Sequence, residues 1–446
     1  MSEHKRMMHL GLLMTANGSH FGAWRLPEAD PAGAFTFAHY VDIVKTAERG
    51  LFDFVFMADT LALIPPKSPK TLGHVPLIAH LEPLTLLSAL SAVTANIGLA
   101  GSATTTYNHP YQVARLFASL DHISGGRACW NLITSSNPAE AWNFGFENHP
   151  DHAHRYDRAR EFAEVVQGLW DSWTDDAFVY DKTGGLYFDP ARMHPIEHQG
   201  AHFAVKGPLN MARPPQGRPI VAQAGSSEAG RDLAAATAEI VFTAQQNFAG
   251  AQAFYSDLKR RTEVCGRHPQ DIVILPGIAP IVGQTEAEAR ETFERLQDAF
   301  DPLIGLDALS AEFGIDLSAY SLDRPLPEDL PASPRATSRR DLMLAEARRE
   351  TLTLRQMAAR TASLGHWTLC GTPVQIADVL EQLFRDGAAD GFIIMPSALP
   401  SGIEAFVRWV VPELQRRGLF RSAYESRTLR GNLGLPIPQR NDPRAE

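Results

Sequence analysis

Eight short apolar segments alternate with amphipathic segments along this chain, and this alternation limits its fold more than any other feature. The apolar segments have the length of strands, and the intervening segments have the apolar spacing of helices. Such an alternation is typical of a parallel α/β fold, and eight strand–helix pairs in series predict a closed (β/α)8 barrel. The predicted strands are residues 8–15, 52–59, 97–105, 128–135, 219–226, 240–244, 272–279 and 391–397. The predicted helices are residues 35–50, 83–95, 110–122, 154–172, 228–237, 249–264, 373–386 and 402–417.

Three long segments interrupt the alternation: a Pro- and Lys-rich loop at about 60–80, a hairpin-like excursion at 174–217, and residues 285–365. Residues 285–365 are predicted to begin with a charged helix, to continue through a Pro-rich stretch and to end in another charged helix. Loops of this length in a barrel usually serve as lids or binding walls, although a surface that only makes an oligomer contact is the alternative. We therefore expect one barrel domain over residues 1–446, with these insertions and an irregular C-terminal arm at 420–446.

The charge balance and the cysteines exclude several classes of protein. A net charge of −10 argues against a nucleic-acid partner and an anionic membrane surface. Cys129, Cys265 and Cys370 lack the spacing of a zinc site, and we expect reduced, mostly buried thiols. No apolar run approaches a membrane span, and the N-terminus lacks an uninterrupted signal sequence. These features predict a cytoplasmic protein with a small-molecule partner.

Polar residues follow the predicted strands, at the end where barrels of this kind carry their active sites. Because the carboxyl ends of all eight strands meet at one rim, we expect these side chains to converge. Asn131 stands out because it interrupts the apolar run ACWNLIT. The others include Thr15, Asn17, Asp59, Thr104, Thr105, Thr106, Thr134, Ser135, Ser136, Gln223, Ser226, Ser227 and Ser397.

The sharpest local feature is QAGSSEAGRDLAA, in which a strand ends and a helix begins at Ser226 and Ser227. Free N–H groups and the helix dipole make such a turn an anion site. The alternative is that a serine only caps the helix.

A second feature lies in DHAHRYDRAR, where His152 and Tyr156 are four residues apart at the start of a helix. Both project from one face and can bind the same group. His152 and His154 also form an H-x-H pair, but no later strand end supplies matching ligands, and we predict no metal site. The other alternative is that these histidines are only solvated.

The loop after the first strand contains His20, Trp24 and Arg25. An arginine beside an aromatic can clamp an anionic or planar ligand, or the tryptophan can simply attach the loop to the surface. Neither a nucleophile elbow, a Walker loop nor a dinucleotide-binding motif occurs in its required context. A barrel lined by hydroxyls, amides and one carboxylate indicates chemistry that belongs to an organic cofactor.

Several blocks together resemble a known family: LEPLTLLSALSAVTANIGLAGSATTTYNHPYQVARLFASLDHISGGRACWNLITSS, HRYDRAREFAEVVQGLW and QAGSSEAGRDLAA. The chain is similar over nearly its whole length to the bacterial luciferase-like flavin-dependent monooxygenases, in the nitrilotriacetate monooxygenase subgroup. The resemblance implies a (β/α)8 barrel that binds reduced FMN supplied by a separate NAD(P)H:flavin reductase. It implies that O2 forms a C4a-peroxyflavin, which oxygenates a small sulfur compound, aminopolycarboxylate or related substrate. A homo-oligomer, dimer or tetramer, is also expected.

The flavin contacts of the family map onto Asp59, Thr105, His152, Tyr156 and Ser227. Asn131 and Ser226 are further flavin contacts implied by the resemblance, and His20 and Arg25 become candidates for orienting substrate. No residue is required as a strong general base. Alternatives are a deazaflavin-dependent hydride-transfer enzyme on the same barrel, a non-catalytic flavin-binding protein, and a metal-dependent hydrolase that uses His152 and His154.

Overall fold

Eight parallel strands form a closed barrel in the computed structural model, which describes residues 6–63, 73–74, 79–330, 338–361 and 365–440. Strands β1 to β4, β7, β8, β9 and β11 pair in this order, and β11 pairs with β1. Their bounds are β1 His9–Leu13, β2 Phe54–Met57, β3 Gly98–Thr104, β4 Ala128–Ile133, β7 Ile220–Gln223, β8 Ile240–Thr243, β9 Val273–Val282 and β11 Gly391–Ile394. The (β/α)8 barrel and each of its eight strands are confirmed.

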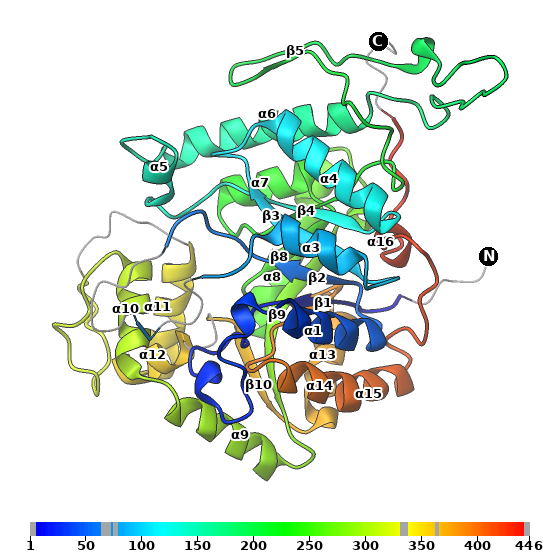
Figure 1. The fold of residues 1–446 in the computed structure, drawn as a ribbon. Helices are drawn as coiled ribbons and strands as arrows, with labels where there is room; N and C mark the ends of the chain where they lie inside the picture. The colour runs from blue at the N-terminus through cyan, green and yellow to red at the C-terminus, as the bar shows by residue number, and fades with distance from the viewer. Residues whose placement is uncertain (1–5, 64–72, 75–78, 331–337, 362–364, 441–446) are drawn as a thin grey trace.

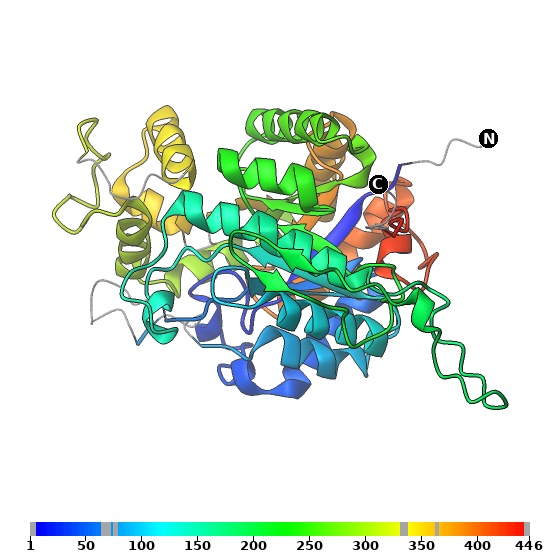
Figure 2. The ribbon, with the colours of Figure 1, turned by 90° about the horizontal axis from the view of Figure 1, so that it is seen from above.

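Helices surround the barrel (Figures 1 and 2). Alternation along β4 shows the division of its faces: Trp130 and Leu132 pack outward against helices, and Cys129 belongs to the apolar cluster inside the barrel. Asn131 therefore points inward. The surrounding helices are α1 Phe37–Arg49, α3 Pro83–Ser91, α4 Pro110–Ser124, α6 His152–Trp170, α7 Glu228–Thr237, α8 Phe248–Val264, α13 Pro373–Arg385, α14 Ser401–Ala405 and α15 Val411–Arg416.

The C-terminal arm fills the amino-terminal end of the barrel. Leu429, Leu433 and Leu435 pack with inward-facing strand residues such as Phe54. Helix α16, Leu429–Asn432, caps this end, and the Leu429 N–H donates to the Gly126 carbonyl at 2.9 Å. The segment that we expected to be irregular is thus ordered up to residue 440, and it closes the bottom of the core; residues 441–446 lie outside the described residues.

The two longer insertions differ in construction. Within 174–217, strands β5 His198–Gln199 and β6 Ala204–Val205 form an antiparallel pair. Residues 285–365 contain α9 Glu286–Asp298, α10 Pro302–Phe313, α11 Ser338–Glu350 and α12 Leu354–Thr361, of which α10 was not expected. Strand β10, Trp367–Gly371, was also missed and extends the barrel wall beside β9. Of the predicted 60–80 loop, residues 64–72 and 75–78 lie outside the described residues, as do 331–337 and 362–364 of the third insertion.

The expectation of mostly buried thiols was wrong for two of the three cysteines. Cys129 is buried inside the barrel, and this burial raises its pKa. Cys265 follows α8 and Cys370 lies on β10, and both are exposed. In the described ranges, no helix combines the length and apolar character needed to cross a membrane.

Replacing Leu429 by Ala tests the role of the arm. The side chain is completely buried, so its removal should lower the free energy of unfolding by about 2–5 kcal/mol through lost burial and a cavity. Urea denaturation followed by circular dichroism measures this. The control, Val264→Ala, removes a side chain that is 78% exposed and should change little. Equal effects of the two variants would show that the arm adds nothing to the core.

Candidate active site

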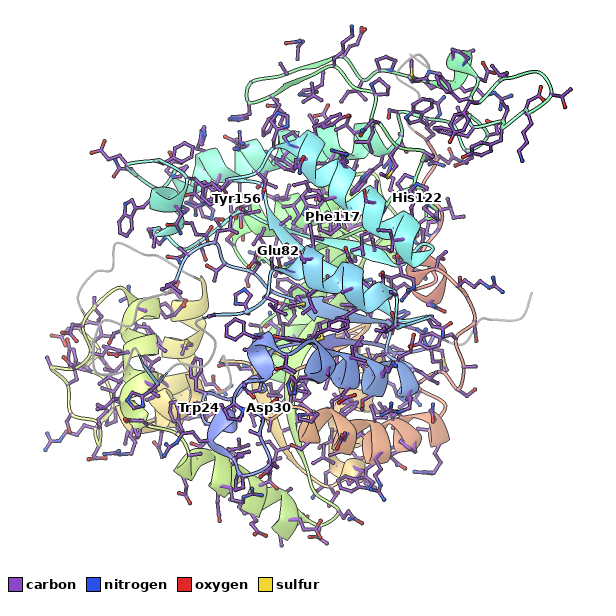
Figure 3. The ribbon with its side chains drawn as sticks, viewed as in Figure 1. Trp24, Asp30, Glu82, Phe117, His122 and Tyr156 are labelled. Carbon is purple, nitrogen blue, oxygen red and sulfur yellow. The ribbon has the colours of Figure 1, made fainter. Side chains whose placement is uncertain are left out.

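The carboxyl ends of the barrel strands open toward the four helices of residues 286–361 (Figure 1). Figure 3 shows Tyr156, near the start of α6, toward this side, and His122, near the end of α4, toward the opposite side. Polar side chains at the strand ends therefore share one rim, as the parallel arrangement requires.

Tyr156 and Ser227 converge at the start of α7. A Cβ atom placed on Gly230 would lie 3.1 Å from Ser227 Oγ and 3.2 Å from Tyr156 Oη, so both groups lie close to the helix backbone, and a larger residue would crowd them. The His152 ring lies beside Tyr156, with ring centroids 4.6 Å apart. Residues from two separate βα units thus surround one helix N-terminus.

Ser227 caps α7, because its Oγ accepts a hydrogen bond from the Gly230 N–H at 3.1 Å. Capping uses a lone pair of the hydroxyl and leaves its O–H free to donate. The two readings of this serine are therefore compatible. Glu228, in the first turn, is paired with Arg231 and Arg261, which reduces its repulsion of an anion at this end. Ser226 precedes the cap and is half-buried.

Asp59 lies just beyond β2, and its side chain is 14% exposed. Its Oδ1 accepts from the Thr60 N–H at 2.9 Å and lies 3.0 Å from His80 Nε2. The histidine comes from the far end of the 60–80 loop, so this contact could not be recognised from local spacing. The pair places a carboxylate and an imidazole at the rim.

Thr105 lies at the end of β3 and is fully buried. Its hydroxyl donates to the Ile133 carbonyl at 3.2 Å, which fixes the ends of β3 and β4 together. Arg158 on α6 donates to the carbonyls of Thr105 and Asn108, each at 3.1 Å. The helix that carries His152 and Tyr156 is thereby attached to the end of β3.

Asn131 occupies the barrel interior one layer above Cys129. Its Nδ2 donates to Ser102 Oγ at 2.8 Å, and the Ser102 hydroxyl donates to the Met57 carbonyl at 3.0 Å. This chain of hydrogen bonds connects the neighbouring strands β4, β3 and β2 along the inner wall of the barrel. Asn131 therefore braces the wall beneath the rim; whether it also contacts a ligand stays a prediction.

Glu140 is a residue of this rim that the sequence analysis missed. It begins α5, Glu140–Asn143, and is only 3% exposed. Its carboxylate accepts from Thr60 Oγ1 at 3.1 Å and from Ser135 Oγ, which also lies 2.8 Å from Thr104 Oγ1. One carboxylate thus joins the loops after β2, β3 and β4. Its position after NPA gave no signal, because its role in joining the loops depends on Thr60, which is 80 residues away in the chain.

Aromatic side chains line another part of the opening. Phe56 packs edge-on against Phe242 with ring centroids 5.8 Å apart, and Phe242 stacks on His366 at 5.1 Å. These rings add an apolar surface beside the polar rim.

His20 is 2% exposed and lies between the loop after β1 and α9. Its Nδ1 accepts from the Gly22 N–H at 3.1 Å, and its Nε2 lies 3.3 Å from the Gln297 amide. Burial lowers its pKa to about 4, so the ring is neutral at pH 7. Arg25 is exposed, and its guanidinium donates to the Ala299 carbonyl at 2.8 Å. His20 and Arg25 thus both contact the end of α9.

The model of the family described as luciferase-like monooxygenase matches residues 16–390. The chain belongs to the luciferase-like monooxygenase family. It is 50% identical to nitrilotriacetate monooxygenase component A of Aminobacter aminovorans, over 97% of this chain and 98% of the relative. It is 46% identical to N-acetyl-S-(2-succino)cysteine monooxygenase of Bacillus subtilis (strain 168), over 98% and 99%. The EDTA monooxygenase structure from Chelativorans sp. BNC1 superposes with a TM-score of 0.83 at 34% identity, covering 97% and 99%.

The site of this monooxygenase has polar groups that suit a heterocyclic cofactor. Asn17 Oδ1, Gln223 Oε1 and Ser397 Oγ are buried near the ends of β1, β7 and β11, and each lacks a hydrogen-bond partner within the described ranges. Buried polar atoms normally have partners, so these atoms indicate that the site is completed by a ligand. The acceptors and hydroxyl suit the ring N–H and carbonyl groups of a flavin, and the start of α7 suits its phosphate.

Replacing His20 by Gln tests whether this neutral histidine affects acid stability. The unfolded chain binds a proton at His20 below pH 6.5, whereas the folded chain does so only near pH 4, so the wild type loses stability as pH falls through this window. The glutamine variant should lose about 3 kcal/mol less than the wild type between pH 7 and pH 4. Urea unfolding at both pH values measures this. The exposed His154→Gln variant is the control, and the same acid loss in all three proteins would contradict the assignment.

Glu140→Ala should leave the Thr60 and Ser135 hydroxyls without their shared acceptor. We expect a loss of about 1–3 kcal/mol in the free energy of unfolding, because the contact that joins the loops is lost, and the two hydroxyls keep only their second partners, the Ala62 carbonyl and Thr104 Oγ1. Thermal and urea denaturation measure the loss, and Glu140→Gln, which retains an acceptor oxygen, should lose less. Glu147→Ala alters an exposed carboxylate in the same region and serves as control. If Glu140→Ala behaved like that control, Glu140 would not join the loops.

Proposed function

We propose that this monooxygenase is the oxygenating component of a two-component system. It binds reduced FMN that a separate NAD(P)H:flavin reductase supplies, and it transfers one atom of O2 to a small organic substrate. The balance is substrate plus O2 plus FMNH2, giving oxygenated substrate, FMN and water. The relatives reported above act, by their names, on two amine chelators and a thioether, which supports an amine or sulfur compound as the substrate.

The observation that carries this proposal is the convergence of Ser227, Tyr156 and His152 on the start of α7. We propose that the N–H groups there, the Ser227 O–H and these two side chains hold the FMN phosphate, with Ser226 beside it. Asp59, Thr105 and Asn131 would then lie along the flavin ring. The whole chain would act as one domain, and a homo-oligomer stays a prediction.

The cofactor supplies the redox chemistry, which in this proposal is that of the flavin C4a-peroxide. The contribution of the protein is binding, orientation and the exclusion of water. Glu140 keeps the loops in place, and the Phe56, Phe242 and His366 rings provide an apolar surface that limits access of water.

The double variant Ser227→Ala, His152→Ala should weaken binding of reduced FMN by at least about tenfold, since it removes phosphate donors. Anaerobic titration followed by flavin fluorescence measures the dissociation constant. The control, Ser119→Ala, removes an exposed hydroxyl on α4. Unchanged affinity in the double variant would refute the phosphate site. Binding of a deazaflavin with no O2 consumption would instead support the hydride-transfer alternative.

A further inference from the structure

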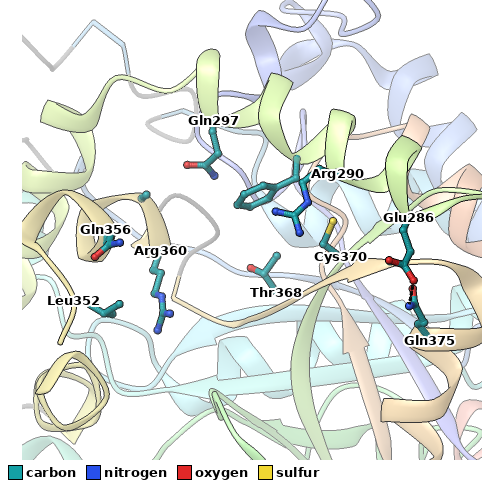
Figure 4. A pocket seen from close by; sticks show the side chains of 12 residues that line it. Glu286, Arg290, Gln297, Leu352, Gln356, Arg360, Thr368, Cys370 and Gln375 are labelled. Atoms are coloured by element: carbon teal, nitrogen blue, oxygen red, sulfur yellow. Dashed lines mark hydrogen bonds between the residues drawn. The ribbon is translucent and has the colours of Figure 1, made fainter. Parts of the chain in front are cut away.

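A pocket of about 620 Å³ lies between α9, α12 and β10 (Figure 4). Its volume falls within the range of small-molecule sites, roughly 300–1,000 Å³. Most of the side chains that line it are polar or charged. They include Arg290 and Gln297 from α9, Gln356 and Arg360 from α12, and Thr368 and Cys370 from β10.

The pocket continues the inner side of the barrel wall. Thr368 is paired with Ala279 of β9, and Cys370 is paired with Ile281. Paired residues of neighbouring strands face the same side of a sheet, and Ala279 belongs to the apolar cluster inside the barrel. Trp367 and Leu369, on the other face of β10, pack against the outer core. A molecule in the pocket therefore lies beside the opening at the carboxyl ends of the strands, on the inner side of the barrel wall.

The pocket also borders the rim through α9. Gln297 lines the pocket and contacts His20, whose backbone N–H donates to the Ser397 carbonyl at the end of β11 at 3.1 Å. His366, which stacks on Phe242 at the opening, precedes β10 directly. The same elements thus form the rim of the barrel and the wall of the pocket.

Within the described part of the chain, the Arg290 guanidinium in this pocket has no ion pair, and the Glu286 carboxylate one turn earlier on α9 is held by a neutral amide and not by a cation. Arg360 is paired with Glu346 at 2.9 Å and with Glu350 at 2.5 Å. Glu286 accepts a hydrogen bond from the Gln375 amide at 2.6 Å. Arg290 has neither an ion pair nor a hydrogen bond with any residue in the described part of the chain. Figure 4 shows its guanidinium extending from α9 toward Thr368 and Cys370.

We propose that Arg290 binds a carboxylate of the substrate, and that the substrate class is therefore a small carboxylic acid. This inference rests on the proposed function, since it names the substrate of the same site. The planar guanidinium pairs with a carboxylate through two parallel hydrogen bonds. Gln297, Gln356 and Thr368 supply further polar groups for a second acidic group. The rest of the substrate reaches from Arg290 toward the barrel opening.

The direct test is calorimetric binding of 2-(methylthio)succinate and of its uncharged dimethyl ester to the full-length protein. The wild type should bind the acid at least about tenfold more tightly than the ester. Arg290→Met should weaken binding of the acid by about tenfold or more and leave the ester unchanged, and Arg290→Lys should recover part of the affinity. Arg295→Met is the matched control, because Arg295 lies on the same helix but pairs with Glu28 at 2.8 Å outside the pocket.

Equal binding of acid and ester, no binding of the acid by the wild type, or unchanged acid binding in Arg290→Met would overturn the role of Arg290. The proposed function is tested separately, by supplying reduced FMN from a flavin reductase and measuring oxygenated products by mass spectrometry. In that assay Arg290→Met should raise the KM for acids such as N-methyliminodiacetate more than it lowers kcat. Acid binding that depends on Arg290 without any oxygenation would reject the proposed reaction and retain the anion site.

Discussion

The filling of the barrel from its amino-terminal end is the constraint on which the rest of the structure depends. A closed eight-stranded barrel has an interior that side chains must occupy, because a void there loses packing on all sides. Here the C-terminal arm contributes Leu429, Leu433 and Leu435, which pack with the inward-facing strand residues at the amino-terminal end of the barrel. The arm is held by buried charges: Arg430 pairs with Glu239, and Arg421 pairs with Asp53. Burial opposes the charged form of Asp53, but Arg421 and His9 outweigh it and lower its pKa.

The interior at the amino-terminal end of the barrel is apolar and filled. Polar groups can therefore gather at the other end, near the carboxyl ends of the strands. The inward residues of β4 show this gradient, from Cys129 in the apolar cluster to Asn131 in a hydrogen-bond chain and then to the rim at Ser135. Each polar side chain in this series has a partner on a neighbouring strand or loop. The rim is therefore held in place by the protein itself, which reduces the reorganisation needed when a ligand binds.

The strands were predictable because burial on both faces makes a parallel strand a short, nearly continuous apolar run. β10 was missed because WTLCG pairs only with β9 and most of its residues are partly exposed, so it lacks the continuous apolar run of the buried strands. The local signals at Ser227 and Tyr156 selected two residues that the structure brings together at the start of α7, and their contact with a ligand stays a prediction. Glu140, His80 and Arg158 could not be identified, since their roles depend on partners about 21 to 80 residues away. Arg25 was named because it lies beside an aromatic residue in the sequence; its guanidinium donates to the Ala299 carbonyl, and its role toward a substrate stays a prediction.

The two anion sites that we propose for this monooxygenase belong to different parts of the chain. The start of α7 is built from βα loops that are attached to the barrel by Arg158 and the rim hydrogen bonds. Arg290 lies on α9, which packs against β9 and the loop after β1, whereas the rest of the insertion has its own apolar cluster around Leu309, Phe313 and Leu354. The contacts described above for Ser227, Tyr156 and His152 do not involve α9 or α12. In our proposal, side chains that line the pocket can therefore change while the barrel keeps its cofactor site, and they determine which charged molecule is bound beside it.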